Sequence, residues 1–277
     1  MKKDDWKTTR IIQDSFGNAF NYLIDIFNDI AYSSGNDTQN YMDKMRNFQN
    51  SEPYNSFVYS IVKRMVTPIA VQNMRTWRMA AKKATKNPYL YRMLMREINN
   101  GLKNDIDIQI EENASLIKTL PLDVANKVTK DISEMTLKGM RASEIAKVIR
   151  EQTDKHSRAS AKLIARTEVS KTTTALTKAR CDNLDIRWYI WRTVKDGKRV
   201  RESHRIMEDV LVCWNEPPSP EALVGEKSVG NYHAGNIWNC RCYPEPVIDI
   251  EDIKWPHKVY HNGKIQMMGK MQFKQML

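Results

Sequence analysis

Apolar side chains recur at helical spacing along the first part of the chain. Residues 11–30 carry one such pattern, and residues 57–84 carry a second, which Pro68 is expected to kink. An Asn-Pro pair precedes a third pattern over 89–99, and Gly101 follows it. Cap, first-turn proline and terminating glycine therefore stand in the order that a helix requires. The sequence predicts that this region is built from consecutive helices.

Further helices are expected before the pattern changes. Pro121 is placed to open a helix that ends near Gly139, and Ser143 to cap another over 144–151. A long helix rich in alanine and threonine is then expected from about residue 154 to 181.

The residue pattern changes after Leu184. Residues 186–194 are aromatic and β-branched, which predicts a strand. Residues 195–198 contain an Asp-Gly turn signal, so 199–201 is expected to return as a hairpin partner. Prolines limit 237–247 to an edge strand or an irregular one.

These patterns predict an α+β protein that is mainly α. A helical N-terminal region is followed by a small C-terminal module, which contains the long helix and the hairpin. We expect three parts: the helical region 1–150, the module 151–250, and a basic, Met-rich tail 251–277 that orders only against a partner.

Charge points to a polyanionic partner. The net charge is +11, and no stretch reaches the roughly 20 apolar residues of a membrane-spanning helix. The N-terminus shows no secretory signal, so we expect synthesis in a cytoplasm. Basic runs over 63–103 and 155–205 favour nucleic acid or an acidic protein, although such a run also suits a solvated face. The candidate contact residues are Arg75, Arg78, Lys82, Lys83 and Lys86.

The cysteines suggest a metal site. Cys240 and Cys242 lie two apart, so an extended backbone separates their side chains by about 6–7 Å, too far for a disulfide. That separation suits two ligands of one zinc ion. His204 is the best third ligand, and His233 or Cys213 could be the fourth. A site with four protein ligands would be a structural zinc site, whereas an open fourth position would indicate a catalytic one. The alternative is that no metal binds and that the cysteines are buried thiols beside a hydrogen-bonded histidine.

Several arginines are candidates for pairing with a carboxylate on the long helix. Glu168 lies among small residues on the expected inward face, where a carboxylate needs a partner. Arg201 or Arg241 could bind it in bidentate fashion and join helix to hairpin, with Arg166 nearby. We interpret the group as structural rather than catalytic.

The order of these motifs resembles a known family. The helix carries Ile164-Ala165-Arg166-Thr167-Glu168, the next segment carries Trp191-Arg192-Thr193 with Arg201 and His204, and Gly235 precedes Cys240-Arg241-Cys242. Together they resemble the Mu F-like domain of phage head morphogenesis proteins, over about residues 154–247. One departure is Met207-Glu208-Asp209, where the family usually has a glycine soon after the histidine.

The resemblance implies a minor capsid protein of a tailed bacteriophage. Such a protein is present in a few copies inside the head near the portal vertex, after assembly in the host cytoplasm. It acts in head morphogenesis and in the fate of packaged or ejected DNA. The expected partners are the portal protein, double-stranded DNA bound without sequence preference, and as further candidates the scaffold or major capsid protein. We expect the helical region to make the portal and DNA contacts, and no membrane to be involved.

Two other functions compete with this one. A metal-dependent nuclease or hydrolase would use His204, His233, Cys240 and Cys242, but the sequence shows no carboxylate-rich metal motif and no nucleophile–base pair. A host DNA-binding regulator would need a helix-turn-helix or a comparable reader, and none is evident. The sequence therefore favours a virion protein that is not an enzyme.

Overall fold

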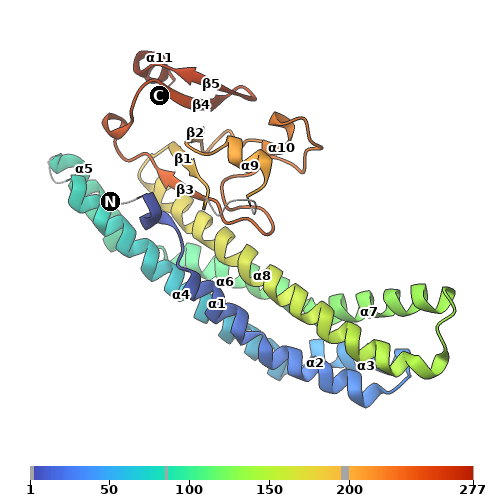
Figure 1. The fold of residues 1–277 in the computed structure, drawn as a ribbon. Helices are drawn as coiled ribbons and strands as arrows, with labels where there is room; N and C mark the ends of the chain where they lie inside the picture. The colour runs from blue at the N-terminus through green and yellow to red at the C-terminus, as the bar shows by residue number, and fades with distance from the viewer. Residues whose placement is uncertain (1–2, 85–86, 195–199, 277) are drawn as a thin grey trace. The chain divides into compact units, whose positions relative to one another are not determined.

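The computed structural model describes residues 3–84, 87–194 and 200–276 (Figure 1). The fold is α+β and mainly α, as predicted: helices make up the N-terminal part, and a mixed sheet follows. Backbone contacts divide the chain into two compact units. Unit 1 comprises Met1–Thr8, Ile69–Ile106 and Val169–Leu277, and unit 2 comprises Thr9–Pro68 and Asp107–Glu168.

The helices follow the apolar periodicity of the sequence closely. The Asn87 side chain caps its helix as expected, accepting the Leu90 N–H at 3.2 Å, and Pro68 lies inside a continuous helix. Among the described residues, no helix has the length and apolar character needed to cross a membrane. The helices are α1 (Arg10–Ala19), α2 (Asn21–Ser34), α3 (Thr38–Gln49), α4 (Glu52–Lys83), α5 (Pro88–Asn100), α6 (Lys103–Lys118), α7 (Leu120–Leu137) and α8 (Ile145–Asn183), after a 3-10 turn at Lys3–Trp6.

Helix α8 corrects two expectations. The helices expected over 144–151 and 154–181 are one helix, and Ser143 lies in a 3-10 turn before it rather than at its cap. The residues between the two expected ranges belong to this helix, and one of them contacts a neighbouring helix. Thr153 is buried, and its Oγ1 lies 2.8 Å from the Tyr41 hydroxyl of α3. Helix α8 also continues across residue 150, where we expected a domain boundary. The functional division of the chain stays a prediction.

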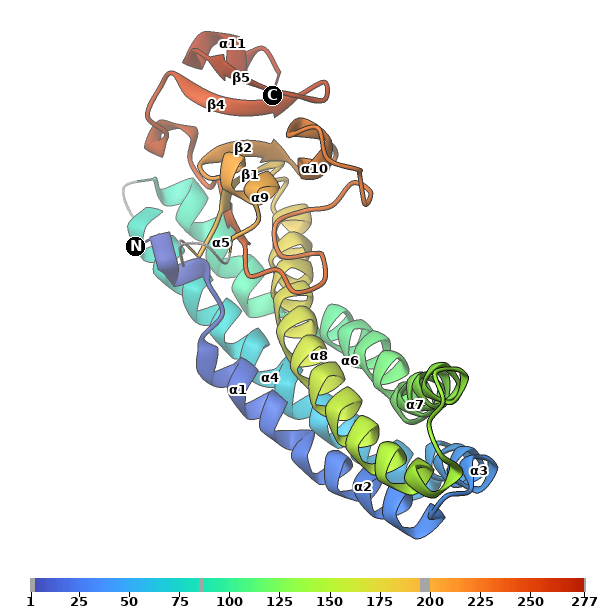
Figure 2. The same cartoon turned by 45° about the vertical axis from the view of Figure 1, so that its right-hand side comes forward.

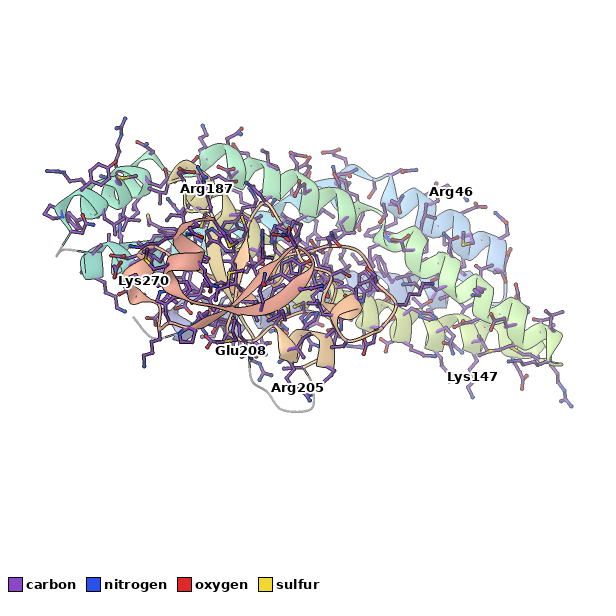
Figure 3. All side chains as sticks on the ribbon, turned by 90° about the horizontal axis from the view of Figure 1, so that it is seen from above. Arg46, Lys147, Arg187, Arg205, Glu208 and Lys270 are labelled. Carbon is purple, nitrogen blue, oxygen red and sulfur yellow. The ribbon has the colours of Figure 1, made fainter. Side chains whose placement is uncertain are left out.

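Unit 2 is entirely helical. Buried tyrosines link the helices of its core through hydrogen bonds. Tyr54 on α4, for example, donates to the Ile117 carbonyl of α6 at 2.6 Å. Charged side chains lie outside this core. Arg46 on α3 and Lys147 on α8 are exposed and project from their helices (Figure 3).

Unit 1 contains the sheet, whose strand order is β3-β1-β2-β4-β5. Strand β1 is antiparallel to both β2 and β3, while β2 pairs with β4 in parallel and β4 with β5 antiparallel. Both edges of β1 are therefore occupied by β2 and β3. The expectation that 199–201 pairs with β1 was wrong for its described residues, 200 and 201, while residue 199 lies outside the described part of the chain. The turn at 195–198 lies outside the described residues. The strands are β1 (Trp188–Arg192), β2 (Val210–Cys213), β3 (Tyr243–Pro246, an edge strand as expected), β4 (His257–His261) and β5 (Lys264–Met268), with short helices α9 (Glu202–Ile206), α10 (Pro220–Leu223) and α11 (Lys270–Lys274).

The sheet is covered on both faces. Trp191 is fully buried in a core that includes Trp77 and Leu94 of the helices. Trp188, three residues earlier, faces the opposite way and packs on Phe273 of α11, with ring centroids 4.7 Å apart. The segment expected to be a tail thus forms β4, β5 and α11, which lie together beside β2 (Figure 2). The expectation of a tail was wrong because its apolar residues complete this second core.

Candidate functional sites

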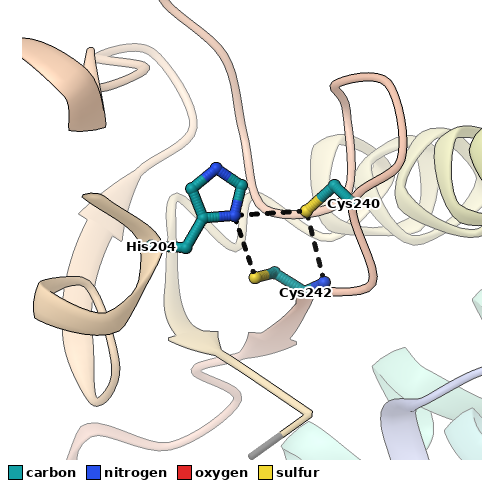
Figure 4. A group of neighbouring side chains, drawn as sticks. All are labelled: His204, Cys240 and Cys242. Atoms are coloured by element: carbon teal, nitrogen blue, oxygen red, sulfur yellow. Dashed lines mark hydrogen bonds between the residues drawn. The ribbon is translucent and has the colours of Figure 1, made fainter. Parts of the chain in front are cut away.

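A short helix and a loop bring together one histidine and two cysteines. His204 lies on α9, and Cys240 and Cys242 lie in the loop that leads into β3. All three are buried, with 3–4% of their surface exposed. The Nδ1 atom of His204 lies 3.5 Å from Cys240 Sγ and 3.4 Å from Cys242 Sγ (Figure 4). The three strongest ligand candidates from the sequence therefore converge on one point.

A glycine lets the cysteine loop approach helix α8. Gly235 has φ +85°, and a Cβ there would lie 2.6 Å from Thr174 Oγ1 and 2.7 Å from the Cys242 carbonyl oxygen. Thr174 Oγ1 donates to the Ala234 carbonyl at 2.7 Å. Only glycine combines this left-handed backbone with so close an approach. The glycine before Cys-Arg-Cys thus allows the loop to pack directly against the helix.

The geometry of the three side chains fits a tetrahedral zinc ion. Zinc–sulfur bonds of about 2.3 Å and zinc–nitrogen bonds of about 2.0–2.1 Å place sulfur and nitrogen ligands about 3.6 Å apart. The two separations in the protein are 3.5 and 3.4 Å. Both sulfurs approach the same nitrogen, whose single lone pair can accept only one thiol proton well. A cation between the three atoms would satisfy both sulfurs at once, so the group can bind a metal.

The thiols are electrostatically unequal. A hydrogen bond from Cys242 lowers the pKa of Cys240 well below its usual value, against the opposing effect of burial. The same hydrogen bond raises the pKa of Cys242, and burial adds to the rise. The Cys242 backbone N–H also donates to Cys240 Sγ at 3.3 Å, which favours a thiolate. One cysteine is therefore ready to bind a cation as a thiolate, and a bound metal would deprotonate the second.

The two candidates for a fourth ligand do not join this group. Among the described residues, the cluster of potential metal ligands consists of His204, Cys240 and Cys242. His233 instead lies with Nδ1 3.2 Å from the Tyr189 hydroxyl, and burial lowers its pKa to about 4. Cys213 ends β2 opposite Trp188. The described part of the chain thus supplies three ligands and leaves one coordination position to another group.

The residues of the predicted arginine network are divided between the two units. Arg166 and Glu168 belong to unit 2, and Arg201 and Arg241 to unit 1. Glu168 is buried, and the Arg201 guanidinium donates to the Trp238 carbonyl at 2.9 Å. Pairing of Glu168 with these arginines stays a prediction.

Sequence reasoning missed a second ion-pair group. Arg192 on β1 is buried and binds both Asp209 and Glu245. Asp209 has φ +65°, the conformation that glycine favours, and it belongs to the Met207-Glu208-Asp209 stretch in which the chain departs from the family resemblance. The aspartate keeps that backbone and adds a carboxylate for Arg192. The signal was available, because an arginine within an otherwise apolar strand needs a partner.

The candidate DNA-binding residues form a stripe on α4. Arg75, Arg78 and Lys82 are exposed, and their spacing places them on one side of the helix together with Lys83. The opposite side, with Trp77, is buried. Lys86 lies outside the described residues. We call Arg75, Arg78, Lys82 and Lys83 the basic stripe.

The one acidic residue in the 63–103 run does not neutralise this surface. Glu97 is buried, and Arg180 Nη1 of α8 lies 3.3 Å from its Oε1. Asn183 also donates to Glu97 Oε1, at 3.0 Å. The described basic residues of the run are exposed, so their charge faces solvent.

Comparison with known proteins agrees with the motif order. Residues 126–244 match the family described as "Phage Mu protein F like protein". The chain thus contains a phage Mu F-like domain, as the motifs predicted. The match begins in α7, earlier than the residues that suggested it, and ends in β3.

One relative shares part of this region. An uncharacterised protein of Haemophilus influenzae (strain ATCC 51907 / DSM 11121 / KW20 / Rd) is 31% identical over 137 residues, which is 50% of this chain and 28% of that protein. The chain thus spans well under half of that relative's length. No solved structure matches the chain.

Proposed function

We propose that this protein is a minor capsid protein of a tailed bacteriophage that acts in head morphogenesis. The observation that carries the proposal is the match of residues 126–244 to the phage Mu F-like family. Family membership of this domain implies a phage head protein. We place it inside the capsid near the portal vertex, with the portal protein as its main partner and scaffold or major capsid protein as further candidates. In this proposal the protein is not an enzyme.

The portal contact can be tested by co-expression. The chain is produced with the portal protein of the same phage genome, and the complex is isolated through a tag on the portal. We expect the chain to co-purify and to sediment with the portal ring. Recovery of an intact portal ring that never carries this chain would contradict the proposal.

We further propose that the basic stripe binds double-stranded DNA through its phosphates. Its support is the grouping of Arg75, Arg78, Lys82 and Lys83 on the exposed side of α4, with Glu97 buried away from it. Phosphate contacts release counterions, so the affinity should fall steeply with salt and be independent of sequence.

Charge reversal tests the stripe. We expect the combined change of Arg75, Arg78, Lys82 and Lys83 to Glu to weaken binding to unrelated DNA duplexes. The slope of log affinity against log salt should become less steep by up to about 3–4, because each phosphate contact contributes about 0.9. A control variant reverses four exposed lysines outside both basic runs: Lys127, Lys130, Lys138 and Lys147. If both variants lose binding equally, net charge rather than the stripe is responsible.

We propose that the histidine–cysteine cluster binds a structural zinc ion. The buried His204, Cys240 and Cys242 support it, because thiolate and imidazole ligands suit zinc and burial suits a stabilising role. Elemental analysis of freshly purified protein should give about one zinc per chain. The variant Cys240→Ser should lose it and melt at a lower temperature. Less than about one-tenth equivalent of zinc in the wild-type protein would refute the site.

A metal-dependent hydrolase is the second candidate function. Three protein ligands leave a coordination position, which is how catalytic zinc sites are built. The burial of all three ligands counts against it, since a substrate needs access. Incubation of plasmid DNA with the zinc-loaded protein, and with added magnesium or manganese, distinguishes the two. Cleavage that Cys240→Ser abolishes would favour the hydrolase.

A further inference from the structure

The side chain that is hydrogen-bonded to Nε2 of His204 determines which ring nitrogen can bind a metal. The Tyr232 hydroxyl lies 3.0 Å from His204 Nε2 and donates its proton to Glu221 Oε1 at 2.6 Å. A hydroxyl has one proton, so its oxygen must accept the hydrogen bond from Nε2. Nε2 then carries the ring proton. Nδ1 is left with a free lone pair, and this is the atom that faces both sulfurs.

We propose that Tyr232 and Glu221 are positioning residues for the metal site, holding His204 in the Nε2–H form so that Nδ1 binds the ion. This inference rests on the zinc site proposed above. Neither residue touches the sulfurs in the described contacts. Their effect passes through the imidazole, whose second nitrogen needs a fixed partner if the ring is to keep one tautomer and one orientation.

The hydrogen-bond chain is built from separate segments of the fold. His204 lies on α9, Glu221 on α10, and Tyr232 in the loop that follows α10. Tyr232 and Glu221 are each 6% exposed, so water competes little for their hydrogen bonds. Ser203 adds a longer contact to Glu221 Oε1, at 3.4 Å. Such a chain of buried groups resists rotation of the imidazole, because rotation would leave a buried hydroxyl without its donor.

Zinc affinity tests the proposal, with competition by a chromophoric chelator as the measurement. We expect Tyr232→Phe, which keeps the ring but removes the hydroxyl, to bind zinc about 10–100-fold more weakly than wild type. Glu221→Ala should show a similar loss. Glu221→Gln keeps a carbonyl acceptor for Tyr232 and should recover most of the affinity. Tyr54→Phe is the matched control, because it removes a buried hydroxyl that donates to the Ile117 carbonyl in unit 2 and does not contact the metal ligands.

A second readout separates positioning from general stabilisation. NMR of protein labelled with ¹⁵N in histidine reports which nitrogen of His204 carries the proton, with and without zinc. We expect Nε2 to be protonated in both states of the wild type and the tautomers to mix in metal-free Tyr232→Phe. With the metal removed by chelator, Tyr232→Phe should melt closer to the wild type than it does with zinc.

Two outcomes overturn the inference while leaving the zinc site intact. One is a Tyr232→Phe protein that binds zinc as tightly as the wild type, and the other is a zinc-loaded wild type with a proton on Nδ1. A wild-type chain that binds no zinc at all overturns the site together with its positioning residues. Wild-type zinc content is measured first, so these failures remain distinguishable.

Discussion

Gly235 shows how a single residue shapes the metal site. Its backbone is left-handed, and the Thr174 hydroxyl and the Cys242 carbonyl occupy the space that a side chain would need. Both neighbours are held in place, because Thr174 is hydrogen-bonded to Ala234 and the Cys242 side chain lies against His204. A side chain at 235 would therefore push the cysteine loop away from α8.

We expect Gly235→Ala to lower the free energy of unfolding by about 2–4 kcal/mol, from backbone strain and overpacking together. The control is Gly225→Ala. Gly225 has φ +75°, but a Cβ there would meet no atom within 4 Å, so only the backbone strain should appear. Chemical denaturation measures both, and equal losses would show that the close approach to α8 does not matter.

The burial of His233 makes stability depend on pH. Burial, helped by Lys178, lowers its pKa from 6.5 to about 4 in the folded protein. The unfolded chain therefore takes up a proton first as the pH falls. The stabilisation is complete above about pH 6.5 and is lost progressively down to about pH 4.

The comparison of wild type with His233→Gln isolates this effect. The difference in free energy of unfolding between the two proteins should change by roughly 1–3 kcal/mol between pH 7 and pH 4.5, to the disadvantage of the wild type. Both proteins are measured with excess chelator, so loss of metal in acid does not contribute. A pH-independent difference would mean that His233 titrates normally in the folded protein.

Residue chemistry was easier to predict than residue pairing. The grouping of His204, Cys240 and Cys242 followed from ligand chemistry and a two-residue spacing, which are local properties. Tyr232 and Glu221 were not predicted, because a tyrosine in a loop carries no sequence signal for the histidine that it contacts 28 residues away. The fourth-ligand candidates lie outside this cluster for a similar reason, because the sequence does not show what a loop histidine or a cysteine at the end of a strand will contact.

At the level of elements, the C-terminal segment completes the sheet. Phe273 on α11 is 1% exposed and packs on Trp188 of β1, while Ile253 and Val259 fill the same core. Without this segment one face of β1 and β2 would lie open to water. The segment is therefore part of the module that carries the metal site.

Removal of the Phe273 side chain tests whether the C-terminal segment stabilises the sheet. We expect Phe273→Ala to cost about 3–5 kcal/mol, as is usual when a buried aromatic ring is removed. Met271→Ala lies on the same helix but is 73% exposed, so it should change stability by less than about 0.5 kcal/mol. Thermal and chemical denaturation provide the measurement. A stable Phe273→Ala protein would show that α11 is only loosely attached.

Element boundaries were predicted where local chemistry sets them. The Asn87 cap and the Pro-rich edge strand β3 come from the backbone preferences of single residues. Strand order was not predictable in this way. The Asp-Gly signal suggested a hairpin, but β1 pairs with β2 and β3, because pairing depends on which apolar faces can be buried together.

For the molecule as a whole, the excess of positive charge and the Mu F-like domain point to the same setting. The net charge is +11, and the basic stripe lies on a helix that precedes the region matched by the family. A protein packed beside DNA would use such charge without reading sequence. The candidate metal site lies within the matched region. In our proposal the two features have different tasks: the stripe binds DNA, and the metal stabilises the domain.

The protein composition of phage particles decides whether this chain is a virion protein. DNA-filled particles of the phage that encodes this chain are purified on a density gradient, and their proteins are quantified by mass spectrometry against the major capsid and portal proteins. We predict that the chain is present at a few copies per particle, near the portal's own copy number rather than the capsid's. Particles that contain portal and capsid proteins but none of this chain would contradict its assignment as a minor capsid protein.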